Sequence, residues 1–96
     1  MPAFVIVEID ITDNEKYNAY KELTPATVSA YGGKFVLRGN PVTVLEGDWN
    51  HERLVMLKFP NKEKAEAWYH SEGYQHAKSV RDGAAKANFL LIESLT

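Results

Sequence analysis

The sequence predicts a single α+β domain from three observations: the length, two kinds of hydrophobic periodicity, and the order of the segments. The chain has 96 residues, 45% of them hydrophobic and 25% charged, so it can form one core but not two. Apolar residues alternate along some segments, as in strands, and recur every three or four residues along others, as in helices. The segments follow one another as strand, helix, strand, strand, helix, strand, and residues 1–96 are taken as one domain.

Residues 3–11 are predicted to form the first strand, because they are rich in β-branched side chains. One face of this strand is wholly apolar. The other face carries two apolar residues, Phe4 and Ile6, followed by two acids, Glu8 and Asp10.

A helix is predicted to start at Thr12 and to run to about Tyr31. Glu15 lies three positions after Thr12, which is the spacing of a capping box, and two glycines follow Tyr31 as a stop signal. Pro25 lies inside the segment and predicts a kink or a break just before it. The residues expected to face the core have helical spacing: Tyr17, Tyr20, Leu23, Thr27 and Ala30.

The middle of the chain is predicted to form short strands. Residues 34–38 and 42–46 have strand composition, and the Gly-Asn-Pro at 39–41 indicates a turn or bulge between them. Residues 53–59 form the next strand, and a turn signal before them makes 42–59 a predicted hairpin.

The second helix is predicted to begin after Asn61, its N-cap, with Glu63 in the first turn. The residues at 71–73 interrupt it, and helical spacing resumes at Tyr74. The buried side of the second helix, before residues 71–73, is expected to contain Ala65, Trp68 and Tyr69. The last strand is expected at 88–95.

The order βαββαβ builds a four-stranded antiparallel sheet with both helices on one face, which is the ferredoxin-like arrangement. The uncovered face would then expose a large apolar patch, which soluble proteins rarely tolerate. We therefore predict a homodimer in which two sheets face each other across a two-fold axis. The residues that favour this are Phe4, Ile6, Leu54, Met56, Leu90 and Ile92.

Composition excludes several classes of function. The 11 basic and 13 acidic residues give a net charge of −2, which disfavours nucleic acid as a partner. The absence of Cys excludes disulfides, thiol nucleophiles and thiolate metal sites. No apolar run reaches membrane-spanning length and the first residues lack a signal-peptide pattern, so a cytoplasmic protein without a membrane partner is expected.

Arg38 is the first candidate for ligand binding. It ends a predicted strand and precedes Gly39, and a planar guanidinium there suits a carboxylate ligand. The alternative is a structural salt bridge to Glu46. Arg81 could close the same cleft, or it could pair with Glu93.

Three aromatic residues form a second group of candidates. Trp68 could line a small-molecule pocket, although core packing is the better explanation for this residue. Tyr69 and Tyr74 carry hydroxyls that need partners when buried, so either could orient a ligand or donate a proton.

Titratable side chains form a third group. His76 lies four residues after Glu72, so the two could pair on one helical face, and His51 and His70 are the other histidines. No pair of histidines has the spacing of helical metal ligands, so no metal site is expected.

Glu8 and Asp10 share a strand face and could form an acid/base pair at the dimer interface. The favoured alternative is that they lie beyond the edge of the interface, or pair with Lys58 or Arg53.

An ordered set of short motifs between about Ala3 and Glu93 resembles a small bacterial family, domain of unknown function 1330. The resemblance implies the dimeric α+β barrel superfamily, which includes cofactor-free monooxygenases, isomerases and ligand-sensing domains. Their ligands usually lie in a cleft between helices and sheet. The motifs are Tyr31-Gly32-Gly33, Arg38-Gly39, Glu46-Gly47, Trp49, Phe59-Pro60, Ala65, Trp68-Tyr69, Ser71, Tyr74 and Arg81.

Two functions remain open from the sequence. The first is a cofactor-free enzyme acting on a small anionic or aromatic metabolite, with Arg38 and Arg81 holding a carboxylate or enolate. The second is a non-catalytic small-molecule-binding or accessory homodimer that uses the same cleft. In the first, a proton would be moved by Tyr69, Tyr74 or His76.

Overall fold

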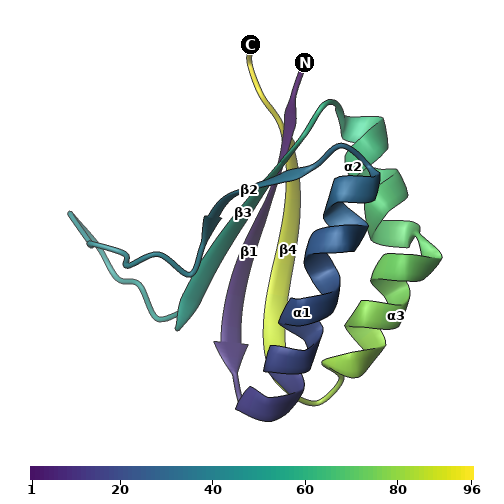
Figure 1. Cartoon of the computed structure of the whole chain (residues 1–96). Helices are drawn as coiled ribbons and strands as arrows, with labels where there is room; N and C mark the ends of the chain where they lie inside the picture. Colours follow the sequence, from purple (N-terminus) through teal and green to yellow (C-terminus); the bar gives the residue numbers. More distant parts are fainter.

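The computed structural model describes all 96 residues and places three helices on one side of a four-stranded antiparallel sheet (Figure 1). The strands lie in the order β2-β3-β1-β4, which is the ferredoxin-like βαββαβ arrangement with its second helical segment divided in two. The predicted fold class is therefore confirmed. The elements are β1 (Ala3–Ile11), α1 (Asn14–Ala30), β2 (Lys34–Arg38), β3 (Arg53–Phe59), α2 (Lys62–His70), α3 (Glu72–Val80) and β4 (Ala85–Glu93).

The predicted interruption of the second helical segment is confirmed only at Ser71, because Glu72 and Gly73 already belong to α3. The Ser71 hydroxyl donates to the carbonyl of Trp68 at 2.7 Å, ending α2, and accepts from the amide of Tyr74 at 3.1 Å, starting α3. At the start of α2, the side chain of Asn61 accepts from the amide of Lys64 at 2.8 Å, so the predicted N-cap is confirmed.

The start of α1 differs from the prediction. Asp13, not Thr12, is the N-cap, and its carboxylate accepts from the amide of Lys16 at 3.2 Å. The predicted capping box with Glu15 is therefore wrong. Of the kink or break predicted at Pro25, the break is wrong, because α1 continues through this residue to Ala30.

The buried face of α1 was predicted correctly only in its first half. Tyr17 and Tyr20 are buried, but the stripe continues through Thr24 and Val28. A helix turns once in 3.6 residues, so a buried stripe must alternate steps of three and four residues. The expected residues were mostly three positions apart, so successive residues lay progressively farther around the helix from the core. The prediction was therefore wrong for Leu23 and Ala30, which are exposed.

Residues 39–52 form a long loop, which we call the arm (Figure 1). The predicted strand at 42–46 and the hairpin at 42–59 are wrong. The edges of β3 are already occupied by β2 and β1, so no edge of β3 is free to pair with the segment. The expected bulge lies instead within β2, between Phe35 and Leu37.

β4 also begins and ends earlier than the predicted 88–95. It pairs with the full length of β1, from Ala3 opposite Glu93 to Ile11 opposite Ala85. This long antiparallel register determines its bounds.

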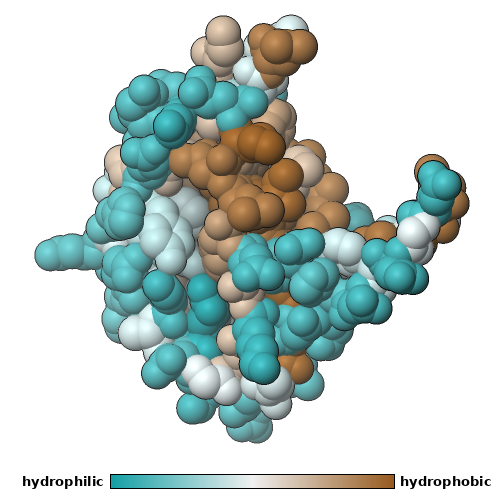
Figure 2. All heavy atoms as spheres, turned by 180° about the vertical axis from the view of Figure 1, so that it is seen from behind, coloured by the Kyte–Doolittle hydropathy of each residue, from teal (hydrophilic) through white to brown (hydrophobic).

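The two faces of the sheet have different surroundings. The helix side of β1, including Val5 and Val7, is buried in the core. The other side, which we call the outer face, is covered by no helix, and Leu90 and Ile92 are each 55% exposed there. Figure 2 shows a continuous apolar area on this side of the molecule. No helix is long and apolar enough to span a membrane.

Candidate functional site

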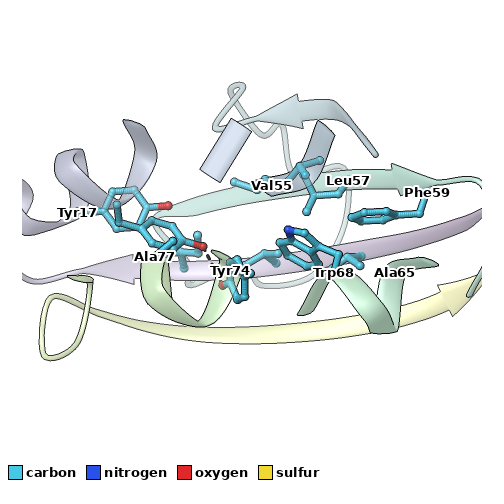
Figure 3. Close-up of a cluster of buried hydrophobic side chains, with 13 residues drawn as sticks. Tyr17, Val55, Leu57, Phe59, Ala65, Trp68, Tyr74 and Ala77 are labelled. Carbon is cyan, nitrogen blue, oxygen red and sulfur yellow. Dashed lines mark hydrogen bonds between the residues drawn. The ribbon is translucent and has the colours of Figure 1, made fainter. Parts of the chain in front are cut away.

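Aromatic side chains form the core between the helices and the sheet (Figure 3). Trp68 is 1% exposed, with its ring centroid 4.3 Å from that of Tyr74 and 5.3 Å from that of Phe59. Its indole nitrogen donates to the hydroxyl of Thr27 at 3.1 Å. Trp68 thus packs and hydrogen-bonds entirely within the protein.

Tyr74 is fully buried, and its hydroxyl lies 2.9 Å from that of Tyr20 (Figure 3). Burial, followed by the neighbouring Tyr74 hydroxyl, raises the pKa of Tyr20 far above its ordinary value. Tyr20 therefore remains protonated at neutral pH and donates or accepts hydrogen bonds as a neutral phenol.

A groove runs beside the edge strand β4, beneath α2 and α3. Its first part is a cavity of about 310 Å³ that includes Trp68, Tyr69 and His70 in its wall. Its second part is a wider hollow of about 570 Å³ that includes Lys78 and Arg81. The two parts share Tyr69, Phe89 and Leu90, so we treat them as one site and call it the β4 groove.

The sequence of β4 explains why there is space below α3. Ala85 and Ala87 lie on the helix side of this strand and leave room that larger side chains would fill. β4 is also an edge strand, so the groove is open on one side.

Tyr69 is half-buried in the wall of the β4 groove. Its hydroxyl accepts a hydrogen bond from the ammonium of Lys78 at 3.0 Å. An ammonium group only donates, so the Tyr69 hydroxyl keeps its own hydrogen for another acceptor. A molecule in the groove that carries an oxygen could accept it.

Arg81 follows the last residue of α3 and is half-buried. Its guanidinium lies 5.2 Å from the ring centroid of Tyr20 and 5.3 Å from that of Phe89. It forms no ion pair, so the alternative of a bridge to Glu93 is not realised, and its Nε is buried without a hydrogen-bond partner. Burial acts to lower the pKa of Arg81, but the hydroxyls of Tyr74 and Tyr20 outweigh it and raise the pKa. Arg81 is thus a permanent cation without an ion-pair partner, and Glu8 is the one carboxylate that lines the same hollow.

Arg38 lies on the opposite flank of α1 and has an intramolecular partner. Its Nη2 donates to the carbonyl of Lys21 at 2.7 Å and to the hydroxyl of Thr24 at 3.3 Å. Pro25 has no N–H, so the Lys21 carbonyl lacks the donor that a helix normally supplies four residues later. Arg38 supplies a donor in its place, the Thr24 hydroxyl donates to the same carbonyl at 3.3 Å, and Arg38 forms no bridge to Glu46. The cavity beside it is only about 30 Å³.

Arg53 is a cation that the sequence analysis assigned to the wrong face. It alternates with Val55, Leu57 and Phe59, so its side chain lies on the helix side, 5.8 Å from the ring centroid of Tyr17. Its Nε is buried without a partner, and a Cβ at Gly39 would collide with its guanidinium.

Tyr17 lies among the charges of Arg53, Arg81 and Arg38. Burial raises the pKa of Tyr17 despite these positive charges. Its phenol therefore remains neutral at physiological pH, so the guanidinium charges around it are not balanced by a tyrosinate.

Glu8 and Asp10 lie on the outer face, and both contact His51. The imidazole Nε2 is 3.7 Å from Glu8, and Nδ1 is 3.3 Å from Asp10, so the pairing suggested with Lys58 or Arg53 is absent. The amide of Glu52 donates to Asp10 at 2.8 Å, and this hydrogen bond is the main reason that the pKa of Asp10 is lowered. The cluster attaches the end of the arm to β1. No group of side chains has a metal-binding arrangement.

The two helical histidines differ in position. His76 is exposed on α3, forms no ion pair with Glu72 and lines no part of the β4 groove. His70 contributes to the first part of the groove, and its ring centroid is 5.3 Å from that of Tyr69. The structure thus brings Trp68, Tyr69, Tyr74 and Arg81 together but leaves Arg38 and His76 elsewhere. Lys78 and Phe89 are additional groove residues that sequence reasoning did not identify.

Comparison with known proteins gives a family and a fold. The family model described as domain of unknown function (DUF1330) matches residues 2–95. No curated protein matches the chain significantly. A protein of unknown function from Rhodopseudomonas palustris has a similar structure, with a TM-score of 0.78 at 19% identity over 99% of this chain and 83% of that one.

Two other solved structures are also similar. SnoaB, a cofactor-independent oxygenase from Streptomyces nogalater, has a TM-score of 0.65 at 8% identity, covering 99% of this chain and 94% of SnoaB. A dimeric ferredoxin-like protein of unknown function from Jannaschia sp. CCS1 has a TM-score of 0.69 at 13% identity, covering 98% of this chain and all of that one (100%). These identities establish the fold alone.

Proposed function

The chain belongs to the DUF1330 family, and we propose that it is a homodimer that binds a small anionic molecule with an aromatic or apolar body in the β4 groove. The observation that carries this proposal is Arg81, a half-buried guanidinium without a carboxylate partner and with an unpartnered Nε. A carboxylate or enolate oxygen would supply the missing acceptor.

The rest of the groove suits the body of such a ligand. Phe89, Leu90 and Leu91 provide apolar surface, and the ring of Tyr69 adds an aromatic wall. Ligand sites typically combine such surfaces with a few polar groups that determine orientation. Here Arg81 and Lys78 attract the anion, and the Tyr69 hydroxyl donates to a second oxygen.

The enzymatic form of the proposal gives Tyr69 the role of proton donor. Its hydroxyl accepts a hydrogen bond from Lys78, which holds the hydroxyl in place and leaves its own hydrogen available to a ligand in the groove. Tyr74 lies behind this position and supports Tyr20, whereas His76 has no part in the mechanism. SnoaB has the same fold and acts as an oxygenase without a cofactor, which favours testing such chemistry.

The second candidate is a non-catalytic binder, and the neutral tyrosines favour it. The raised pKa values of Tyr17 and Tyr20 prevent either residue from acting as a base near neutral pH. A binding protein needs only the cation, the aromatic wall and the groove.

Binding is tested by thermal shift with aromatic carboxylates, phenols and quinones, measured on the wild type and on Arg81→Gln. A ligand at 100 times its dissociation constant stabilises the native state by about 2.7 kcal/mol, which a melting curve resolves. We expect the shift for carboxylates to disappear in Arg81→Gln and to persist in Lys16→Gln, an exposed cation on α1. A shift that persists in Arg81→Gln would contradict the proposed site.

Catalysis is tested on any compound that binds. Tyr69→Phe retains the ring and loses the hydroxyl, so an enzyme should retain binding and lose turnover, measured as product formation or oxygen uptake. Tyr31→Phe, outside the groove, is the matched control. No turnover in the wild type identifies the non-catalytic binder.

The outer face supports the dimeric part of the proposal. We propose that the two sheets pack against each other, because Leu90 and Ile92 are each 55% exposed on an uncovered apolar face. Ile92→Lys should therefore give a folded monomer in light scattering. Leu45→Lys, at a 95% exposed position in the arm, is the control and should remain dimeric.

A further inference from the structure

The outer face carries opposite charges at its two ends. Lys34 and Lys58 lie at one end, which we call the basic end. Glu8, Asp10 and Glu52 lie at the other, which we call the acidic end. An apolar area separates the two ends.

The basic end has no counter-charge in its own chain. Lys34 and Lys58 are direct cross-strand partners, and neither forms an ion pair. Like charges directly opposite each other destabilise a sheet. A carboxylate from outside the chain would relieve this repulsion.

The acidic end has an excess of negative charge. On the outer face, the groups that face Glu8 and Asp10 are His51 from the arm, Glu52, and Lys86, whose charge acts on Asp10. Lys78 and Arg81 line the same hollow as Glu8, but they come from the helix layer and form no ion pair with it. On the outer face, three carboxylates thus share one lysine and one imidazole. Cations from a partner would complement this end.

The apolar middle lies midway between the charged ends. Ile6 pairs with Met56 on one side and with Leu90 on the other. Two residues away along β1, Phe4 pairs with Lys58, and two residues away in the other direction lies Glu8. A two-fold rotation about an axis that crosses the strands at Ile6 therefore brings Lys58 of one copy to the same level along the strands as Glu8 of the other.

A homodimer with facing sheets has two simple choices of two-fold axis. An axis parallel to the strands places each charged end on the same end of the partner, so acid meets acid and lysine meets lysine. An axis perpendicular to the strands places the basic end on the partner's acidic end, and apolar middle meets apolar middle.

We propose that the two-fold axis of the dimer runs across the strands over Ile6, so that Lys34 and Lys58 contact the acidic end of a second copy of this chain. This inference rests on the proposed sheet-to-sheet homodimer and adds its orientation. Ion pairs then form twice, once on each side of the axis. Like-charge contacts disfavour the other orientation.

Charge exchange tests the orientation. Lys34→Glu/Lys58→Glu and Glu8→Lys should each raise the dimer dissociation constant about tenfold or more at low salt, because each homodimer then contains two repulsive contacts. An equimolar mixture should restore a heterodimer of nearly wild-type affinity in native mass spectrometry. Lys62→Glu, on α2, is the control and should leave dimerisation unchanged.

The outcomes separate this inference from the proposed function. A wild type that is monomeric contradicts the proposed homodimer. A wild-type dimer that tolerates both charge variants, or whose variants fail to recover when mixed, overturns the orientation alone.

Cysteine cross-linking provides a second test that does not depend on those variants folding well. The chain has no native Cys, so an introduced thiol has no other partner. Phe4→Cys and Glu8→Cys, when mixed, should form a disulfide-linked heterodimer, because an axis across the strands over Ile6 places Phe4 of one copy opposite Glu8 of the other. Phe4→Cys that cross-links with its own copy and not with Glu8→Cys would indicate the parallel axis and overturn the inference.

Discussion

Residues of the helix side and of the outer face alternate along the same strands, but the two faces differ in what covers them. On β1, Val5 and Val7 are buried by side chains from α1, α2 and α3, whereas Phe4 and Ile6 on the outer face have no helix above them. One chain therefore builds its own core on one side but leaves an apolar surface on the other. The helix side determines folding and the β4 groove, and the outer face determines association.

The charged residues of the two faces show the same difference. The helix side holds Arg81 and Arg53 without carboxylate partners, although buried cations are normally paired. The outer face holds charges of both signs at separate ends. The first arrangement suits a small anion, and the second suits a second copy of the chain.

The largest effect should come from breaking the helix side. Trp68→Ala removes a 1% exposed ring that contacts Phe59 and Tyr74, and should lower the free energy of unfolding by about 3–5 kcal/mol. Ile92→Ala, on the outer face, should lower it much less at concentrations where the chain is monomeric. Urea denaturation followed by far-UV circular dichroism measures both, and equal losses would contradict the contrast between the faces.

Crowding the same core should have a smaller effect. A Cβ at Gly33 would lie 2.6 Å from a ring carbon of Phe59 and 2.7 Å from a methyl group of Val28, so Gly33→Ala should cost about 1–3 kcal/mol. Gly73→Ala is the matched control, because its Cβ would meet only Thr27, at an ordinary contact distance of 3.4 Å. Melting temperatures distinguish the two, and similar values would show that the core accommodates the methyl group.

Substitution of Arg38 tests whether this cation on the helix side stabilises the fold. Arg38→Ala removes the closer of two side-chain donors to the Lys21 carbonyl, the other being the Thr24 hydroxyl, and should cost about 1.5 kcal/mol. Pro25→Ala restores an N–H four residues after Lys21, so Arg38→Ala should cost less in that background. A double-mutant cycle measures the coupling, and additive losses would contradict this role.

The smallest effect at neutral pH should come from Tyr20→Phe, which removes one hydrogen bond and should cost about 1 kcal/mol. Its pH dependence is more informative. The pKa of Tyr20 is raised on folding, so its contribution to stability is complete below the ordinary value of 10.0 and is lost as the pH rises above it. The wild type should therefore lose stability faster above pH 10 than Tyr20→Phe does. If the stabilities of the wild type and of Tyr20→Phe fall in parallel with rising pH, the raised pKa of Tyr20 is contradicted.

Much of the fold could be predicted from the sequence because local signals determine it. Alternation identified β1 and β3, Asn61 identified the start of the second helix, and the signal at 71–73 identified the division before the third helix to within two residues. The prediction was wrong for the segment at 42–46, because strand composition does not show whether a sheet edge is available for pairing.

The candidate site was predictable only in part. Tyr69 and Arg81 were identified from residue type, and the structure places both in the β4 groove. Lys78 was missed because its role depends on a contact with Tyr69 nine residues away. The contact between Arg38 and Lys21 depends on long-range packing, although the missing N–H of Pro25 was a signal for it in the sequence.

The measurement that most directly tests the contrast between the faces is the molar mass of the wild-type chain by light scattering at micromolar concentration. A chain whose outer face needs a second copy should have twice the 10.8 kDa of one chain, and should approach that single-chain mass only on dilution. A stable 10.8 kDa species at high concentration would show that the outer face tolerates water and would contradict the account.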